Sequence, residues 1–127
     1  MNIEAGLLYT NDHEWVRVEG DLAYIGITDF AQHSLGDIVF VELPEIDSDL
    51  KVGETLGVVE SVKAASDVYC PVSGVVKDVN SELEDEPEKI NSDPYGCWFA
   101  AIEIKDASDV EKLMDADAYK EFCKGEE

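Results

Sequence analysis

The sequence is organised around residues 57–69, which read GVVESVKAASDVY. Residues that favour strands stand on both sides of a single lysine, Lys63, and the small residues Ala64–Ser66 follow it directly. Two strand-forming runs separated by a short segment of this kind are typical of a β-hairpin. The stretch therefore predicts a tight hairpin that holds Lys63 at its tip, with the lysine amine in water.

Lys63 has no other cation near it in the sequence. The nearest basic residues are Lys51 and Lys77, whereas the acidic residues Glu60 and Asp67 flank the predicted tip. A surface lysine is most often simply solvated. An isolated amine on a rigid projection also suits an enzyme that must acylate one lysine and reject every other. Lys63 is therefore the candidate modification site.

The length and the charge limit the class of protein. With 127 residues, of which 45% are apolar, the chain is expected to form one domain over residues 1–127 around a single core. Its 30 acidic residues against 9 basic ones give a net charge of −21. Such a surface repels nucleic-acid phosphates and anionic lipids, so neither is an expected partner. Proteins that dock here should present basic surfaces.

The cysteines and histidines form no recognisable metal or catalytic motif. The cysteines lack Cys-x-x-Cys spacing, and the only histidines are His13 and His33, which we expect to be structural. An odd number of scattered cysteines predicts reduced thiols and a cytoplasmic protein, and we expect neither export nor membrane insertion. Without a nucleophile motif or a phosphate-binding loop, the sequence favours a cofactor carrier over an enzyme.

Short strands separated by turn residues are predicted through most of the chain. They are expected at residues 13–18, 22–27, 38–43, 55–62, 66–69, 75–79 and 98–104. Residues 38–43 are almost continuously apolar, which predicts a strand that is buried on both faces. Residues 45–53 are expected to be a polar connection, and the acidic residues 81–91 to be a solvated loop.

Two helical segments are predicted. Residues 29–35 should form a short helix that Thr28 caps and Gly36 ends. Ser108–Glu111 has the pattern of a capping box, which would open a C-terminal helical segment over 108–123 with a break near Asp115. Many short strands with few helices favour a two-sheet β-sandwich or flattened barrel.

Four further segments are distinctive besides the hairpin sequence Glu60–Ala64. They are DHEWV at 12–16, GITD at 26–29, LGDIVFVELP at 35–44 and NSDPY at 91–95. Together, in this order and over nearly the whole chain, the five segments resemble those of the glycine cleavage system H protein family. A lysine-bearing hairpin alone would indicate only a lipoyl or biotinyl carrier.

The resemblance implies a fold and a cofactor. The fold would be mainly β, a barrel-sandwich hybrid of two antiparallel sheets with a short inserted helix and a C-terminal helical segment. Lipoic acid would be bound to Lys63 through an amide. The hairpin recognised for this attachment would comprise Glu60, Ser61, Val62 and Ala64.

The resemblance also implies partners. The lipoyl arm would accept an aminomethyl group from glycine decarboxylase, which uses pyridoxal phosphate, and pass it to aminomethyltransferase, which uses tetrahydrofolate. Dihydrolipoamide dehydrogenase, with FAD and NAD, would reoxidise the arm, and a lipoate-attaching enzyme would modify Lys63. The carrier itself is expected to be a monomer.

A loaded arm needs protection, because an aminomethyl thioether in water can lose its carbon as formaldehyde. A cleft that excludes water and offers a carboxylate to the ammonium would slow this loss. The resemblance assigns this cleft to Glu14, Asp67, Asp12 and Ser34. Many relatives have histidine at the position of Ser34, and His33 lies one position earlier, about 100° away around a helix. The turn at 95–98 is also shorter than in relatives.

Other functions remain open at this stage. A lipoyl relay that supplies lipoate to other enzymes would use the same Lys63. A biotinyl domain is disfavoured because biotinylated lysines typically lie between methionines, whereas Val62 and Ala64 flank this one. Lipoyl domains of 2-oxoacid dehydrogenases usually lie in longer chains with linkers. A binding module that has lost its cofactor would differ from all of these in the intact mass of the native protein.

Overall fold

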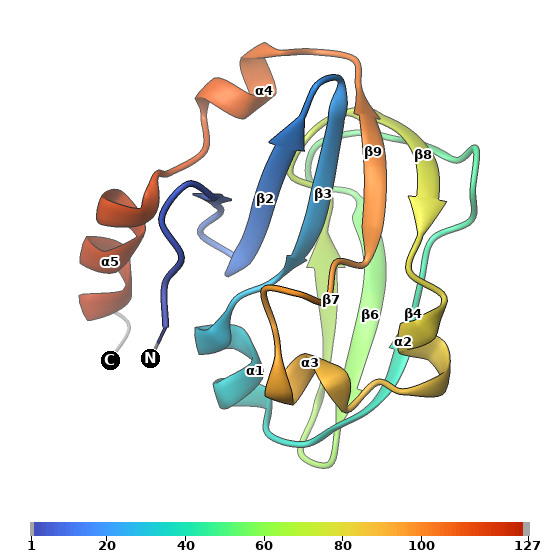
Figure 1. Ribbon diagram of the computed structural model, residues 1–127, viewed down its shortest axis with the longest axis vertical. Helices are drawn as coiled ribbons and strands as arrows, with labels where there is room; N and C mark the ends of the chain where they lie inside the picture. The colour runs from blue at the N-terminus through green and yellow to red at the C-terminus, as the bar shows by residue number, and fades with distance from the viewer. Residues whose placement is uncertain (1, 126–127) are drawn as a thin grey trace.

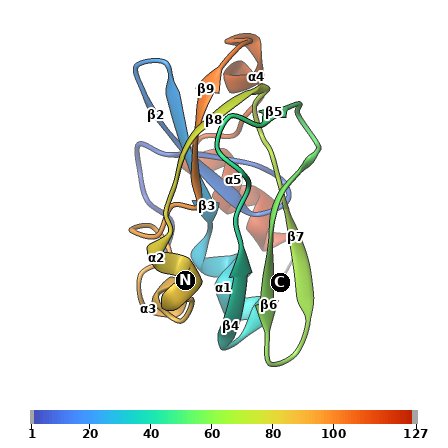
Figure 2. The same cartoon turned by 90° about the vertical axis from the view of Figure 1, so that its right-hand side faces the viewer.

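The computed structural model describes residues 2–125 and consists mainly of two antiparallel sheets. The larger sheet is ordered β1 (Leu8–Tyr9), β2 (Glu14–Glu19), β3 (Leu22–Ile27), β9 (Ala100–Ile104), β8 (Gly74–Val79) and β5 (Asp49–Leu50). The smaller sheet is ordered β4 (Ile38–Glu42), β6 (Thr55–Ser61) and β7 (Ala65–Tyr69). Figures 1 and 2 show the smaller sheet beside the larger one. The predicted mainly β fold of two antiparallel sheets is confirmed.

The core lies between the two sheets. Val16, Ile25 and Ile102 of the larger sheet pack in one cluster with Val59 and Val68 of the smaller sheet, and all five are at most 2% exposed. Burial of this many β-branched side chains is the main favourable contribution to folding.

The lysine hairpin is held close to its neighbouring strand. A Cβ atom at Gly57 would lie 2.3 Å from the carbonyl oxygen of Glu42, so only glycine lets β6 lie this near β4. The position of the hairpin relative to β4 therefore depends on this glycine.

The inserted helix forms where the sequence predicts it. Helix α1 spans Asp29–Leu35, and its N-cap Thr28 accepts a hydrogen bond from the backbone N–H of Ala31. Gly36 ends the helix with φ of +82°, a conformation that side chains with a Cβ rarely adopt. The chain then turns directly into β4, so the end of α1 comes next to the hairpin tip (Figure 1).

The acidic segment 81–91 is not a solvated loop, so that prediction is wrong. It contains helices α2 (Glu82–Asp85) and α3 (Lys89–Ser92), which bury Leu83 and Ile90 to 1% and 0% exposure. Pro87, between the two helices, is buried as well, while the surrounding carboxylates remain exposed to water. The many acidic residues suggested a loop, although α2 and α3 are short helices with one buried side chain each.

Strand β4 is not buried on both faces, which corrects a second prediction. It lies at the edge of the smaller sheet, and only Ile38 and Val41 are buried. Val39 is 54% exposed and Phe40 is 47% exposed, next to an irregularity in the pairing with β6 between Ile38 and Phe40. A bulge adds a residue on one strand, so alternation no longer sends every second side chain inward.

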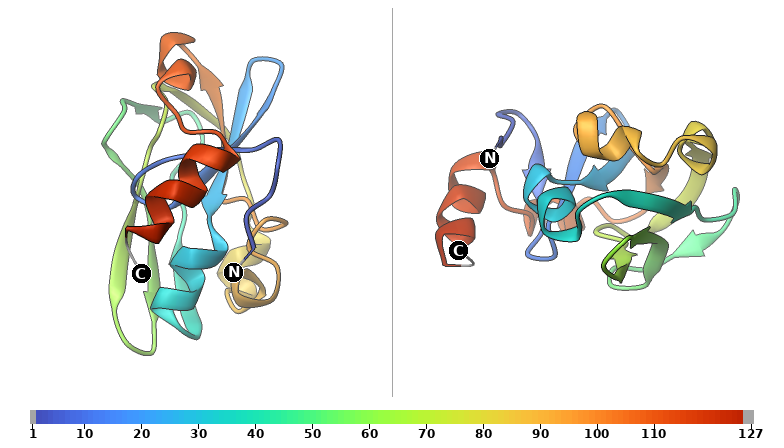
Figure 3. Two further views of the ribbon diagram at one scale, coloured as in Figure 1. Left: turned by 90° about the vertical axis from the view of Figure 1, so that its left-hand side faces the viewer. Right: turned by 90° about the horizontal axis from the view of Figure 1, so that it is seen from below.

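The C-terminal segment is helical, with the predicted break. Helices α4 (Ser108–Glu111) and α5 (Ala116–Lys124) are separated at Asp115, whose side chain accepts a hydrogen bond from Ala118 N–H. The predicted capping box is wrong, because Ala107 is the N-cap of α4 and Ser108 donates to Asp106 instead. Helix α5 packs beside the N-terminal segment (Figure 3).

Two smaller differences lie in connections. The segment predicted as a polar connection contains β5, and the last strand begins at Ala100 rather than at Trp98. In residues 2–125 no helix is both long and apolar enough to span a membrane.

Candidate functional site

Lys63 lies at the tip of the β6–β7 hairpin, as predicted, and is exposed. Ser61 closes the tip, because its Oγ atom accepts hydrogen bonds from the backbone N–H groups of Lys63 (3.1 Å) and Ala64 (3.0 Å). The Ser61 N–H group donates to the Ala64 carbonyl over 2.7 Å. A hydroxyl that satisfies successive N–H groups in this way fixes a turn without bulk, so the backbone presents Lys63 in one orientation.

The tip is tied to the end of α1. Val62 N–H donates to the Asp37 carbonyl oxygen over 3.0 Å. The Lys63 side chain lies against Gly36, since a Cβ built there would be 3.1 Å from the Cε atom of Lys63. Gly36 therefore both ends the helix and leaves room for the lysine side chain. Lys63 takes part in none of the ion pairs found among residues 2–125.

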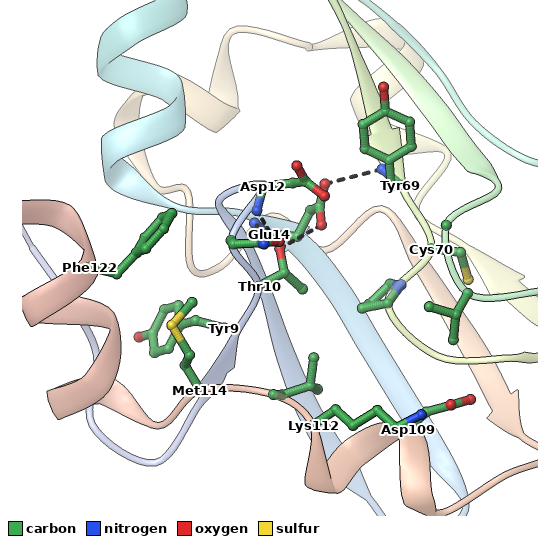
Figure 4. A pocket seen from close by; sticks show the side chains of 15 residues that line it. Tyr9, Thr10, Asp12, Glu14, Tyr69, Cys70, Asp109, Lys112, Met114 and Phe122 are labelled. Carbon is green, nitrogen blue, oxygen red and sulfur yellow. Dashed lines mark hydrogen bonds between the residues drawn. The ribbon is translucent and has the colours of Figure 1, made fainter. Parts of the chain in front are cut away.

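A pocket of about 460 Å³ opens on the side of the molecule that carries the C-terminal segment. Its walls come from the chain around residues 9–14, from residues 69–71 at the end of β7, and from the α4–α5 region (Figure 4). Tyr9, Met114 and Phe122 make one side apolar, while Asp12 and Glu14 supply carboxylates. The pocket combines apolar walls with an acidic end, which suits a ligand that has an apolar chain and a cationic group.

Glu14 is the buried carboxyl of this pocket, with 2% exposure. One oxygen accepts a hydrogen bond from the Thr10 hydroxyl over 2.7 Å, and the other accepts from Tyr69 N–H over 3.1 Å. Burial raises the pKa of Glu14 to about 7, although both hydrogen bonds oppose the rise. Near neutral pH the carboxyl is therefore poised between its two protonation states.

Thr10 positions the acidic end of the pocket. Its Oγ atom accepts hydrogen bonds from the backbone N–H groups of Asp12 (3.2 Å) and Glu14 (3.1 Å). The sequence analysis missed both Thr10 and Tyr69. The first could have been suspected from the pattern Thr-x-Asp-x-Glu at the start of β2, because hydroxyl side chains often hold such turns. Nothing in the sequence indicates that Tyr69 N–H would meet Glu14.

The predicted cleft residues do not all converge. Glu14 and Asp12 line the pocket together, whereas Asp67 and Ser34 do not line it. Asp67 is exposed on β7, two positions before Tyr69, and Ser34 is exposed on α1. The resemblance thus grouped four residues of which only two line the same pocket.

The wall that carries α5 is held by an aromatic cluster. Tyr119 stacks on Tyr9 with ring centroids 4.5 Å apart, and its hydroxyl lies 2.7 Å from Nδ1 of His13 and 2.8 Å from Thr28 Oγ1. The His13 ring stacks on Phe30 at 4.3 Å. These contacts give His13 a structural role, as the sequence predicted.

We expect the thiol that lines the pocket to be unreactive. Cys70 is 1% exposed, and its Sγ atom lies 2.9 Å from the Val72 carbonyl oxygen. Burial raises the pKa of Cys70 to about 11. Because only the thiolate attacks disulfides, a dithiolane could enter this pocket without exchanging with the protein.

A sequence model of the glycine cleavage H-protein family matches residues 7–126. The chain belongs to this family. An H protein of Thermoanaerobacter sp. (strain X514) is 60% identical over 122 residues, which cover 96% of this chain and 97% of the relative. An H protein of Clostridium botulinum (strain Hall) is 57% identical over 123 residues, covering 97% and 95%.

The fold agrees with this assignment. The crystal structure of a glycine cleavage system H protein from Mycobacterium marinum matches with a TM-score of 0.86 and 37% identity, covering 94% of this chain and 97% of that one. The H-protein family consists of lipoyl carriers of the glycine cleavage system, and the barrel-sandwich fold predicted from the resemblance is consistent with this match.

Proposed function

We propose that this H protein carries lipoic acid in amide linkage to Lys63 and serves as the mobile carrier of glycine cleavage. Bound lipoate would supply the dithiolane for aminomethyl transfer from glycine decarboxylase to aminomethyltransferase and for reoxidation by dihydrolipoamide dehydrogenase, and Lys63 would hold it. The observation that carries the proposal is the presentation of Lys63 alone at a rigid, exposed tip in a chain of this family. Tethering raises the concentration of the reactive group at each partner.

We infer that the arm runs from the tip along α1. Gly36 leaves space for the Lys63 side chain at the C-terminal end of α1. From Gly36 back to Thr28 the helix rises about 12 Å at 1.5 Å per residue. The carbon chain of lipoic acid extends about 10 Å from Nζ, given carbon–carbon bonds of about 1.5 Å. The far end would thus come near Thr28, whose N–H donates to the carbonyl of His13, the neighbour of Glu14.

The residues along this path have separate tasks in the proposal. Glu14 is buried, and the two hydrogen-bond donors to its carboxyl, the Thr10 hydroxyl and the Tyr69 N–H, are neutral. In the proposal, its carboxylate accepts a hydrogen bond from the ammonium of the cargo, and Asp12 adds negative charge at the same end of the pocket. Asp67 and Ser34 lie on the two elements that flank the route between tip and pocket. The apolar walls exclude water from the cargo.

The partners in this proposal are glycine decarboxylase, aminomethyltransferase, dihydrolipoamide dehydrogenase and a lipoate-attaching enzyme. All four must approach a chain with a net charge of −21, so their docking faces should be basic. We place the protein in the cytoplasm as a monomer, because the buried thiols of Cys70 and Cys97 fit a reducing compartment and the net charge opposes self-association.

The direct test is the mass of the native protein. Tandem mass spectrometry of protein purified from lipoate-replete cells should locate one lipoyl or octanoyl amide, on Lys63. The Lys63→Ala variant should fold normally, because the side chain is exposed, but should be inactive in glycine cleavage. Lys51→Ala, a change at another exposed lysine, is the matched control and should keep full activity. Modification of a different lysine, or none at all, would refute the carrier function.

A further inference from the structure

Three exposed apolar side chains lie near the hairpin tip, on the side where β4 pairs with β6. They are Val39, Phe40 and Val62, which are 54%, 47% and 68% exposed, and we call them the tip patch. Val62, the most exposed of them, is the immediate neighbour of Lys63. Large apolar residues gathered at one place on a very acidic surface indicate a contact surface.

The strand pairing brings these residues together. Phe40 pairs with Glu60, and the next pair, Val41 with Val59, is buried, so Phe40 and Glu60 lie on the outer face of the smaller sheet. Val62 follows Glu60 by two positions and is bonded through its N–H to Asp37, next to the start of β4. Figure 2 shows β4 and β6 side by side above the tip. The irregularity in β4 leaves Val39 exposed as well.

The rim of the tip patch is acidic. Asp37, Glu42 and Glu60 are exposed, and none of them joins an ion pair within residues 2–125. A second copy of the chain would bring the same carboxylates face to face, with −21 on each side, and is therefore a poor occupant. A partner with an apolar groove bordered by lysine or arginine fits the patch in both respects.

We propose that the tip patch docks the enzyme that acylates Lys63, an inference that rests on the proposed function. The Lys63 nitrogen forms an amide with the carbonyl carbon of an activated acyl donor. The bond from that carbon to the leaving group breaks, and the amine gives up a proton. This enzyme must bring the amine itself into its active site, so it must cover the surface beside the tip. Enzymes that act at the far end of the arm can dock elsewhere on the carrier, because they do not take up the amine itself.

The patch also explains how one of eight lysines is chosen. Charge alone cannot select Lys63, because acidic residues surround most lysines of this chain. If the attaching enzyme must also contact the tip patch, a lysine is acylated only when exposed apolar side chains lie beside it, as they do beside Lys63. Specificity of this kind comes from docking rather than from the reacting atom.

The test compares Phe40→Ser and Val39→Ser with Ile46→Ser. Ile46 is similarly exposed, at 52%, but follows the end of β4 that points away from the tip. Unmodified proteins are incubated with the purified lipoate-attaching enzyme, lipoate and its activating nucleotide, and initial rates are followed by intact mass. We expect kcat/KM to fall about tenfold for Phe40→Ser and severalfold for Val39→Ser, through KM, and to stay unchanged for Ile46→Ser.

Two outcomes would overturn the inference, and they differ. Wild-type rates in both Phe40→Ser and Val39→Ser would remove the docking surface and leave the carrier function intact. Absence of acylation in the wild-type protein would remove the carrier function as well. Thermal unfolding of each variant checks the fold, and Val39, which is more than half exposed, keeps the test valid if Phe40→Ser is unstable.

Discussion

At the scale of single residues, Glu14 is a buried carboxyl with no counter-ion among residues 2–125. Its hydrogen-bond partners, the Thr10 hydroxyl and the Tyr69 N–H, are neutral, and burial raises its pKa to about 7. An ammonium that enters the pocket would favour the ionised carboxylate and lower this pKa. In the loaded protein, the pKa of Glu14 should therefore lie below 7. At a pH above this lowered pKa, the carboxylate is ionised and holds the ammonium of the cargo.

This pairing predicts how fast the loaded protein loses formaldehyde. A charge-assisted hydrogen bond contributes about 1.5–3 kcal/mol, so Glu14→Gln should speed release by roughly tenfold or more at pH 8. At low pH the wild-type carboxyl is protonated and cannot pair, so the ratio of the two rates should approach one. The measurement is formaldehyde release after the enzymes have been removed, from about pH 4 to 8.5, because a bond of this strength lowers the pKa of Glu14 in the loaded protein by about 1–2 units. Glu84→Gln, the same change at an exposed carboxyl of α2 outside the pocket, is the matched control and should leave the rate unchanged.

At the scale of elements, local signals in the sequence predicted most of the fold. The lysine hairpin, β3 and α1 all formed where turn residues and caps indicated them, because those signals act within a few residues. The errors lie where distant contacts decide. The exposed face of β4 depends on its place at a sheet edge, and the burial of Leu83 and Ile90 depends on the core that they reach.

The candidate site divides in the same way. Lys63 was found from its own neighbours along the chain, and the structure presents it as expected. The pocket could not be predicted from neighbours along the chain, because Tyr9, Tyr69 and Phe122 come to the pocket that contains Glu14 only through the fold. Asp67 and Ser34 were grouped with Glu14 by resemblance, and the pocket does not include them.

One side chain, Asn91, joins three of these elements. Its Oδ1 atom accepts from Ile38 N–H over 2.8 Å, and its Nδ2 atom donates to Gln32 Oε1 over 2.9 Å and to the Gly36 carbonyl over 2.8 Å. It thereby fixes α3 against the junction between α1 and β4. The same junction supports the Lys63 side chain and the tip.

Asn91→Ala should therefore lower the free energy of unfolding by about 2–3 kcal/mol. The estimate follows from three hydrogen bonds worth about 0.5–1.5 kcal/mol each, with partly buried partners left unsatisfied. Urea unfolding followed by tryptophan fluorescence measures it. Asn80→Ala is the matched control, because the Asn80 side chain makes none of the hydrogen bonds found in residues 2–125, and it should cost less than about 1 kcal/mol. Equal losses in the two variants would contradict the bracing role.

At the scale of the whole molecule, the dominant feature is the charge of −21. Within the described part of the chain, four lysines form ion pairs with carboxylates at exposed positions, and such pairs contribute little to stability. The remaining excess of negative charge creates a long-range field around the protein. A field of this kind speeds encounters with basic partners and suppresses contacts between copies of the carrier.

The field predicts that docking of the carrier is sensitive to salt. The Debye length falls from about 30 Å at 0.01 M ionic strength to about 8 Å at 0.15 M, so most of the steering should be lost over this range. The apparent KM of glycine decarboxylase for the lipoylated protein should then rise severalfold or more, with a smaller change in kcat, because screening slows encounter rather than chemistry. Free lipoamide is uncharged and supplies the control. With dihydrolipoamide dehydrogenase, the apparent KM for lipoamide should stay nearly constant as salt is raised, while the apparent KM for the lipoylated protein should rise. If the protein and lipoamide respond alike, the negative surface serves solubility and does not guide docking.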